Sequence, residues 1–177
     1  MVAFGVGVTA ATPSAKDAKR ILQAVDVALY VAPSKVGPVA FTLYWIAPAA
    51  TTQPLLEWWN LGADGAFKRD GQRITRIAAD IPDVNKVIPE ATAGDIVEVQ
   101  RLGKEQLRAV VKGRPHALFG PDRDQPIVLA ERFLDALLPH WEFNDWYEFR
   151  SLGHLKPVAA WRDGQFAALI MPVRIAT

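Results

Sequence analysis

The chain has 177 residues, enough for one ordinary domain with a buried core, because single domains usually contain about 100–150 residues. Half of the residues are hydrophobic and 22% are charged, which excludes an intrinsically disordered chain. The net charge of +1 indicates neither nucleic acid nor a membrane surface as a partner. The chain contains no cysteine, which excludes disulfides, thiol nucleophiles and cysteine-ligated zinc.

The apolar N-terminus predicts a first strand. Residues 1–12 have no basic segment and are interrupted by Gly5 and Gly7, so a secretory signal is not expected. The longest uncharged run, residues 36–56, has membrane-spanning length but contains three prolines, and only residues 39–46 are continuously apolar. We therefore expect a cytoplasmic protein with no membrane partner.

A first unit is predicted over residues 1–80. Ser14 followed by Asp17 resembles a helix capping box, and apolar residues at helical spacing then predict a helix that continues to Leu29 and ends at Pro33. Residues 39–46 predict a buried strand, and residues 55–61 and 72–78 predict two more, separated by a turn-rich stretch. The order is strand, helix, strand, strand, strand.

Residues 81–94 predict a linker, and a second unit is predicted over residues 95–177. This unit begins with an extra strand and helix at 96–112, followed by a loop at 114–125 and a strand at 126–129. A helix at 130–138 then precedes strands at 143–150, 155–162 and 165–175, and the last two are joined by Asp163-Gly164, a strong hairpin signal. The order strand, helix, three strands recurs. We expect one α+β domain made of two β-α-β-β-β units, with the helices on one face of antiparallel sheets.

Three segments carry a resemblance to a known family. Residues 70–74 read Asp-Gly-Gln-Arg-Ile, residues 81–89 read Ile-Pro-Asp-Val-Asn-Lys-Val-Ile-Pro, and residues 171–175 read Met-Pro-Val-Arg-Ile. In this order they resemble the Asp-Gly-His-Arg-Leu, Phe-Pro-Asp-Tyr-Arg-Arg-Val and closing Met-Pro-Met-Arg-Leu segments of the bacterial DNA polymerase sliding clamp, the β subunit of DNA polymerase III. Clamp chains carry three domains and this chain has length for about one. The resemblance therefore implies a shortened relative with a DNA-clamp-like fold.

In clamps the three segments converge on a hydrophobic pocket that accepts short peptides of polymerases, clamp loaders and repair proteins. Methionine suits such a pocket because it repacks around different apolar anchors, and arginine at the rim can bind peptide carbonyls or carboxylates. Gln72 replaces the family's histidine and Val84 its tyrosine. Carried over by matching position, the predicted pocket comprises Gly71, Gln72, Arg73, Ile74, Pro82, Lys86, Val87, Met171, Pro172, Val173 and Arg174.

Clamps also hold double-stranded DNA in a hole lined by helices, through nonspecific phosphate contacts. The resemblance thus makes candidates of the cations on the predicted helices. Acidic residues are interleaved with them, and a solvated helix face of mixed charge explains the same pattern equally well. The DNA-facing candidates are Lys16, Lys19, Arg20, Lys104, Arg108, Lys112 and Arg132.

No catalytic set is expected, and neither is a metal or another cofactor. The sequence has no Ser-His-Asp arrangement, phosphate-binding loop or dinucleotide motif, and His116, His140 and His154 lack metal-ligand spacing. Trp58-Trp59 would suit stacking on single-stranded bases, but neighbouring strand residues point to opposite faces, which favours a core role for one of them.

The favoured hypothesis is a sliding-clamp-like processivity factor of DNA replication, not an enzyme, that binds clamp-motif peptides of polymerases and related factors. This hypothesis extends to a homo-oligomer that encircles DNA. Because a clamp ring is built from six domains, a one-domain chain would need about six copies to close it. The alternative is a monomeric phage or mobile-element protein that mimics or inhibits a host clamp. Oligomeric state and binding to a clamp distinguish the two.

Overall fold

The computed structural model describes residues 14–101, 106–111, 127–143, 146–153 and 155–173. Its N-terminal half contains α1 (Ala15–Leu22), β1 (Ala28–Ala32), β2 (Val39–Phe41), β3 (Trp45–Pro48), a 3-10 turn (Ala49–Thr52), α2 (Gln53–Trp58), β4 (Gly65–Asp70) and β5 (Arg73–Ile77). Its C-terminal half contains β6 (Asp95–Arg101), β7 (Gln106–Val111), β8 (Ile127–Ala130), α3 (Glu131–Leu137), β9 (Glu148–Ser151), β10 (Val158–Arg162) and β11 (Gln165–Ile170). The strand predicted at 1–12 and the loop predicted at 114–125 lie outside the described residues.

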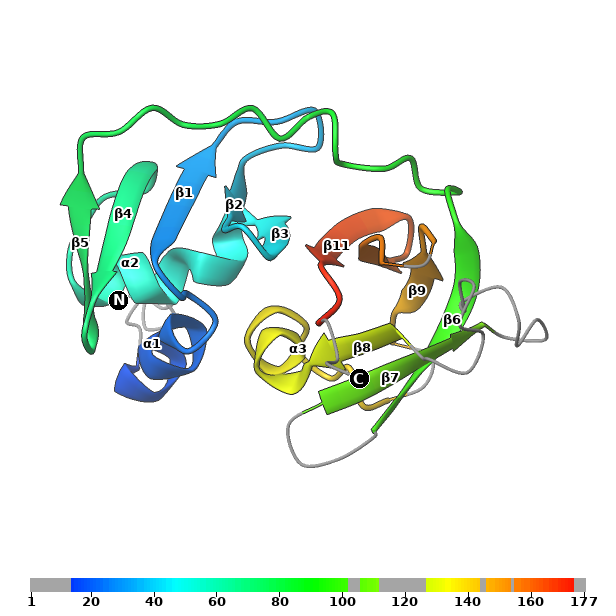
Figure 1. The fold of residues 1–177 in the computed structure, drawn as a ribbon. Helices are drawn as coiled ribbons and strands as arrows, with labels where there is room; N and C mark the ends of the chain where they lie inside the picture. The colour runs from blue at the N-terminus through cyan, green and yellow to red at the C-terminus, as the bar shows by residue number, and fades with distance from the viewer. Residues whose placement is uncertain (1–13, 102–105, 112–126, 144–145, 154, 174–177) are drawn as a thin grey trace, which may run out of the picture.

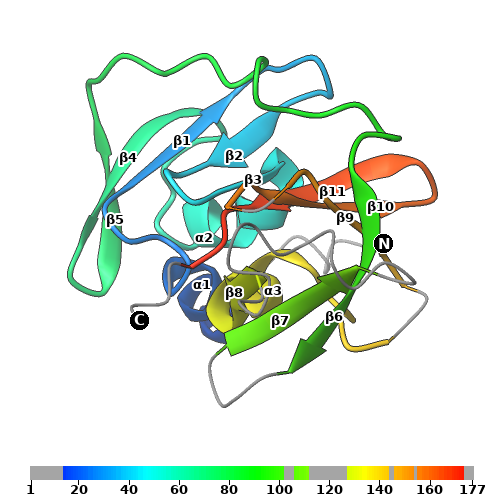
Figure 2. The same cartoon turned by 45° about the vertical axis from the view of Figure 1, so that its right-hand side comes forward.

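The described strands form one antiparallel sheet in the order β5-β4-β1-β2-β3-β11-β10-β9-β6-β7-β8. The two halves join where β3 pairs with β11, with Ile46 opposite Leu169 and Trp45 opposite Ile170. Figure 1 shows α1 and α3 on the same side of the curved sheet, and Figure 2 shows the strands arching over both. The fold is therefore α+β, with one large antiparallel sheet and three helices. Among the described residues, none of the helices has the length and apolar character that a bilayer crossing requires.

The helices pack against the inner face of the sheet. Trp45, Phe67 and Phe133 are the largest of the fully buried side chains there. Fully burying a side chain of this kind stabilises a fold by about 1.5–3 kcal/mol. The indole Nε1 of Trp45 donates to the carbonyl oxygen of Ala24 at 2.8 Å, so this core tryptophan also fixes the chain that leaves α1.

A second apolar cluster lies on the outer face of the sheet. Alternation along β2 sends Ala40 into the inner core and Val39 and Phe41 into this outer cluster. Residues 78–94, which contain no helix or strand, supply Ile88, whose side chain is 2% exposed. The segment predicted as a linker therefore covers the outer face, while the division of the chain into two units stays a prediction.

Several predicted elements are confirmed. Ser14 caps α1, because its Oγ accepts a hydrogen bond from Asp17 N at 3.1 Å. The strands at 72–78, 96–99 and 126–129 and the helix at 130–138 correspond to β5, β6, β8 and α3. Asp163 and Gly164 have φ angles of 50° and 77°, and they form the tight turn between β10 and β11.

Two predictions near the N-terminus were wrong in extent. The first helix ends at Leu22, and residues 28–32 form β1, in which Leu29 and Val31 are buried while their neighbours are half-buried. The single strand predicted at 39–46 is a hairpin of β2 and β3, closed by a turn in which Thr42 N donates to Trp45 O at 2.9 Å. In both stretches apolar residues continue past the break, so periodicity alone did not locate it.

Other elements differed from the prediction in type or in length. The strand predicted at 55–61 is α2, which has Pro54 in its first turn, where the missing N–H is harmless. The turn-rich stretch before residue 72 contains β4, and the helix predicted at 104–112 is β7, paired with β6 and β8. The last three strands are shorter than predicted and occupy β9, β10 and β11.

Candidate functional site

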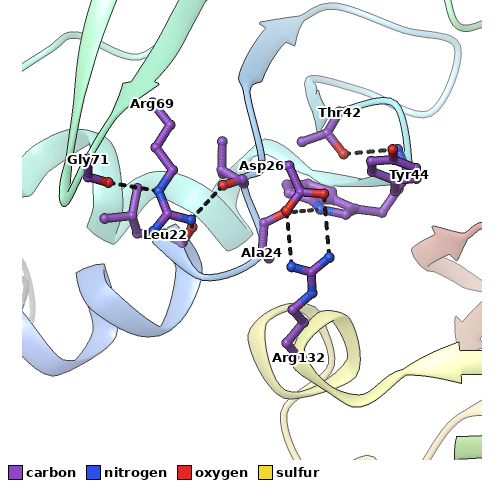
Figure 3. A network of polar contacts seen from close by, with 10 residues as sticks. Leu22, Ala24, Asp26, Thr42, Tyr44, Arg69, Gly71 and Arg132 are labelled. Atoms are coloured by element: carbon purple, nitrogen blue, oxygen red, sulfur yellow. Dashed lines mark hydrogen bonds and ion pairs between the residues drawn. The ribbon is translucent and has the colours of Figure 1, made fainter. Parts of the chain in front are cut away.

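The first of the three segments forms the turn between β4 and β5. Gly71 has a φ of 65°, which glycine adopts without strain, and its carbonyl oxygen accepts from Arg69 Nε at 2.9 Å. The same guanidinium donates to the carbonyl oxygens of Leu22, the last residue of α1, and of Val25, and Figure 3 shows its bond to Gly71. Ile74 is fully buried beneath this turn.

The second segment lies in the stretch over the outer face of the sheet. The side chains of Pro82, Lys86 and Val87 are exposed, and Val87 is 54% exposed. Asn85 holds the stretch in place by accepting a hydrogen bond from Lys35 N at 2.9 Å. In Figure 1 the chain leaves β5 at the end opposite to the β4–β5 turn and runs past β1 and β2 toward β6.

The third segment continues from β11 and is held from two sides. Met171 N donates to Tyr44 O at 2.8 Å, and Val173 N donates to Val128 O at 2.7 Å. Val173 therefore forms an isolated antiparallel bridge to β8. Met171, Pro172 and Val173 are half-buried, and Arg174 lies outside the described residues.

The structure does not bring the three segments together. The Gly71 turn closes the β4–β5 hairpin, whereas the second segment packs through Ile88 in the outer cluster with Val39 and Phe41 of β2. In the sheet, β5 is separated from β11 by β4, β1, β2 and β3. Five strand steps correspond to about 24 Å along the sheet, at roughly 4.8 Å each. The eleven-residue pocket stays a prediction from the resemblance, and the geometry instead supplies a surface around its third segment.

We name this surface the junction surface and define it by Leu43, Tyr44, Met171 and Pro172. The register that pairs Trp45 with Ile170 continues to place Tyr44 opposite Met171. Leu43 and Tyr44 form the tip of the β2–β3 hairpin and are 85% and 44% exposed. The backbone N–H of Tyr44 is held by Thr42 Oγ1 at 3.1 Å (Figure 3), so the tip that presents Leu43 has a fixed shape.

The junction surface rests on α3. The ring of Tyr44 stacks on Phe133 with 6.2 Å between centroids, and the guanidinium of Arg132 lies 4.6 Å from the Phe133 centroid. Arg132 also pairs with Asp26, at 3.0 Å between Nη1 and Oδ1, and joins α3 to the chain before β1 (Figure 3). Sequence reasoning did not find Leu43 and Tyr44, since it placed both inside one buried strand.

Two of the predicted DNA-facing cations have structural roles. Arg20 Nη1 donates to the carbonyl oxygens of Asp135 and Ala136 at 3.0 Å each, so it caps the end of α3, and Arg132 is paired as above. Lys16 and Lys19 are exposed on α1. Arg108 lies in β7, and Lys104 and Lys112 lie outside the described residues. The helix cations therefore do not form one free basic face.

A partly open pocket of about 1220 Å³ lies between β6, β9, β10 and the chain after α3. Trp141, Trp146 and Tyr147 are part of its wall, and the Arg162 guanidinium lies 3.6 Å from the Trp146 ring centroid. Burial raises the pKa of Tyr147 above its ordinary value of 10.0, and Arg162 and the Trp146 indole partly offset this rise. Tyr147 Oη donates to Pro139 O at 2.7 Å. The sequence analysis did not identify this wall. The high density of aromatic residues between 141 and 149 is the sequence feature that could have indicated it.

The part of the chain that the structure describes holds no group of three or more His, Asp or Glu side chains able to bind a metal ion. No family model and no curated protein matches the chain. Among solved structures, the chain is distantly similar to a DnaN sliding clamp (DNA polymerase III subunit beta) from Bartonella birtlesii bound to griselimycin. The TM-score is 0.35 at 14% identity, and the match covers 93% of this chain and 61% of the clamp chain.

Proposed function

We propose that the chain is a peptide-binding protein of DNA replication that receives clamp-motif peptides on the junction surface. The proposal is for a binding protein and not for an enzyme. The observation that carries it is the position of Met171, whose backbone is bonded to the exposed tip of the β2–β3 hairpin beside Leu43. The segment that resembles the closing motif of clamps therefore lies next to the most exposed of the large apolar side chains described.

The chemistry of the junction surface suits apolar peptide anchors. A thioether side chain is flexible and polarizable and adapts to different apolar partners, while Pro172 limits the backbone beside it. An exposed leucine and a tyrosine that stacks on a core phenylalanine offer both apolar area and a rigid wall. A peptide rich in Leu, Phe and Gln, as clamp-binding segments are, would cover this area.

The DNA-encircling ring is a separate hypothesis. It requires free cations on the helices, and Arg20 and Arg132 are engaged in contacts within the protein. One observation favours the monomeric alternative, a protein that mimics or inhibits a clamp. The outer edge of β8 is occupied by Val173, so this end of the sheet is not free to pair with another copy. Light scattering and a direct binding assay with a clamp protein separate the two hypotheses.

The test of peptide binding is a titration of the full chain with a fluorescent, polymerase-derived clamp-binding peptide. We expect Met171→Asp and Leu43→Ser each to weaken binding at least about tenfold, because each removes apolar contact at the centre of the surface. Phe143→Ser is the matched control, since Phe143 is also exposed (61%) but belongs to the chain after α3. Wild-type protein that binds no peptide would refute the proposal.

Val87→Ser decides a further point in the same titration. Val87 belongs to the predicted eleven-residue pocket but not to the junction surface. Unchanged binding in this variant restricts the site to the junction surface. Weaker binding means that the second segment joins the site when peptide is present.

A further inference from the structure

The apolar residues of the junction surface continue along the same end of the sheet. The register of β10 and β11 places Val158 opposite Ile170. One residue further toward this end, Met171 therefore lies opposite Pro157, and Leu152, directly after β9, donates its N–H to Pro157 O at 3.1 Å. Pro157 and Leu152 are half-buried. A row of apolar residues thus leads from Met171 to the turn between β9 and β10.

The row ends at Leu155, which lies in that turn in an unfavourable conformation. Its φ is 59°, in the left-handed region that residues with a side chain seldom adopt. The other described non-glycine residues with positive φ are polar, and short polar side chains such as Asn and Asp tolerate this region better than leucine does. The Leu155 side chain is 48% exposed, so full burial does not offset the strain.

The turn that displays Leu155 is held at its base. Ser151 Oγ accepts a hydrogen bond from Gly153 N at 3.2 Å, and Lys156 N donates to Gly153 O at 3.2 Å. Ser151 is 3% exposed, so the turn is anchored in the buried part of the sheet. Strain that the surrounding contacts maintain is typical of residues that act in binding.

We propose that Leu155 is a second anchor for peptides that bind the junction surface. This inference rests on the proposed function and names the kind of peptide, an extended segment with two apolar side chains and an acidic residue beyond the second. Leu155 belongs to none of the three segments that resemble clamps. The resemblance therefore does not imply this anchor, which follows from the register and from the conformation of the turn.

The sheet order gives the spacing of the two anchors. Leu43 lies in the turn between β2 and β3, and Leu155 lies in the turn between β9 and β10. In the order β2-β3-β11-β10-β9, three strand steps separate the two turns, which is about 14 Å at roughly 4.8 Å per step. An extended peptide covers this distance in about four residues, at roughly 3.4 Å each.

Lys156 supplies the charge at the Leu155 end of the row. Its side chain is exposed and forms no salt bridge within the described residues. A carboxylate beyond the second anchor of the peptide would approach this ammonium group. Because exposed ion pairs contribute little energy, Lys156 acts mainly on the choice and orientation of the peptide.

The experiment extends the peptide titration of the full chain. Two longer forms of the polymerase-derived peptide carry a leucine four residues before or four residues after the apolar part of the motif, with a glutamate on its outer side. We expect one of them to bind at least about fivefold more tightly than a matched form with serine in place of the added leucine. Leu155→Ser should abolish this difference, whereas the control Phe143→Ser, which also removes an exposed apolar side chain, should keep it.

Two further variants test the strain and the charge. Leu155→Asn should raise the Tm by about 2 °C or more, because asparagine tolerates positive φ, and should also abolish the preference for the added leucine. A lower Tm in this variant would refute the argument from strain. Replacing the added glutamate with glutamine should weaken binding about twofold at low salt, and Lys156→Gln should remove that effect.

The titration separates failure of this inference from failure of the proposed function. If wild-type protein binds the original peptide but binds the leucine and serine forms equally, the second anchor is wrong and the junction surface stands. If wild-type protein binds none of the peptides, both are refuted.

Discussion

Arg20 is the residue for which the resemblance and the structure predict different consequences. As a DNA-facing cation it would affect phosphate binding and leave stability unchanged. In the structure its guanidinium binds the carbonyl oxygens of Asp135 and Ala136 at the end of α3, both at 3.0 Å. These carbonyls belong to the last turn of a helix, which has no partners of its own for them. Arg20→Ala should therefore destabilise the fold.

The size of the effect is worked out by counting the two bonds as one, because both come from the same nitrogen, Arg20 Nη1. A hydrogen bond from a charged donor contributes about 1.5–3 kcal/mol when buried, but the Arg20 side chain is 36% exposed, so the lower end applies. A cation near a helix C-terminus adds about 0.3–1 kcal/mol. Together these give a loss of about 2 kcal/mol in the free energy of unfolding. For a chain of this size the corresponding drop in Tm is roughly 4–8 °C.

The assay is urea denaturation followed by tryptophan fluorescence, with Lys16→Ala and Lys19→Ala as matched controls. Both lysines are exposed on the same helix, so each control removes one positive charge from α1 without removing a described contact. We expect the controls to stay within about 0.5 kcal/mol of wild type. If Arg20→Ala is no less stable than Lys19→Ala, the contact with α3 contributes nothing and the reasoning fails.

Three further predictions concern an ion pair, a tyrosine with a raised pKa and a tight turn. A double-mutant cycle of Asp26→Asn and Arg132→Met should give a coupling below about 1 kcal/mol that shrinks with salt, because the two side chains are 34% and 47% exposed; a larger, salt-independent value would contradict this. The raised pKa of Tyr147 means that the folded protein favours the neutral phenol, so its contribution to stability is complete below pH 10.0 and is lost as pH rises through the folded pKa. Tyr147→Phe should therefore show a shallower loss of unfolding free energy than wild type above pH 10.0, and equal slopes would count against the assignment. Gly164→Ala should cost about 1 kcal/mol in thermal unfolding, because φ is 77° there, whereas Gln165→Ala, at an exposed position beside it, should cost less.

The elements predicted correctly are those marked by local chemistry. Ser14 caps α1 because serine accepts a hydrogen bond from the first turn of a helix that follows it. Asp163-Gly164 favours a tight turn because both residues tolerate positive φ. β7 shows the limit of such reasoning. Leu107, Val110 and Val111 have helical spacing, yet this segment forms a hairpin with β6, the preceding strand, and pairs on its other side with β8, the next strand. Local spacing carries no information on which strands are available as neighbours.

The residues of the candidate site also fall into two groups, those that a local motif marks and those whose position depends on the tertiary structure. Met171 was found in the sequence because a short motif marks it, but Tyr44 was not, since its position depends on a register between strands more than 100 residues apart. The split of residues 39–46 into β2 and β3 exposes Leu43 at a turn, although the sequence around it is uniformly apolar. The cations on α1 were identified by charge, but the contact of Arg20 with α3 depends on the packing of the two helices.

The isolated bridge between Val173 and Val128 bears on the oligomeric state that we expect. A ring that continues the sheet from one copy to the next needs two free edges on each copy, because its interface is heterologous. Among the described residues, the edge of β8 is occupied at Val128 by the bond from Val173 N to Val128 O. We therefore expect a monomer at all concentrations in light scattering.

Val173→Pro tests this reason for the monomer. Proline removes the N–H that occupies Val128 O and opens the edge of β8, so the variant should associate as concentration rises. Val173→Ala keeps the N–H and should remain monomeric, which separates the loss of the bond from the loss of the valine side chain. A wild-type assembly of about six copies would instead mean that the ring closes through a different surface, or that the bridge at Val173 opens when copies meet.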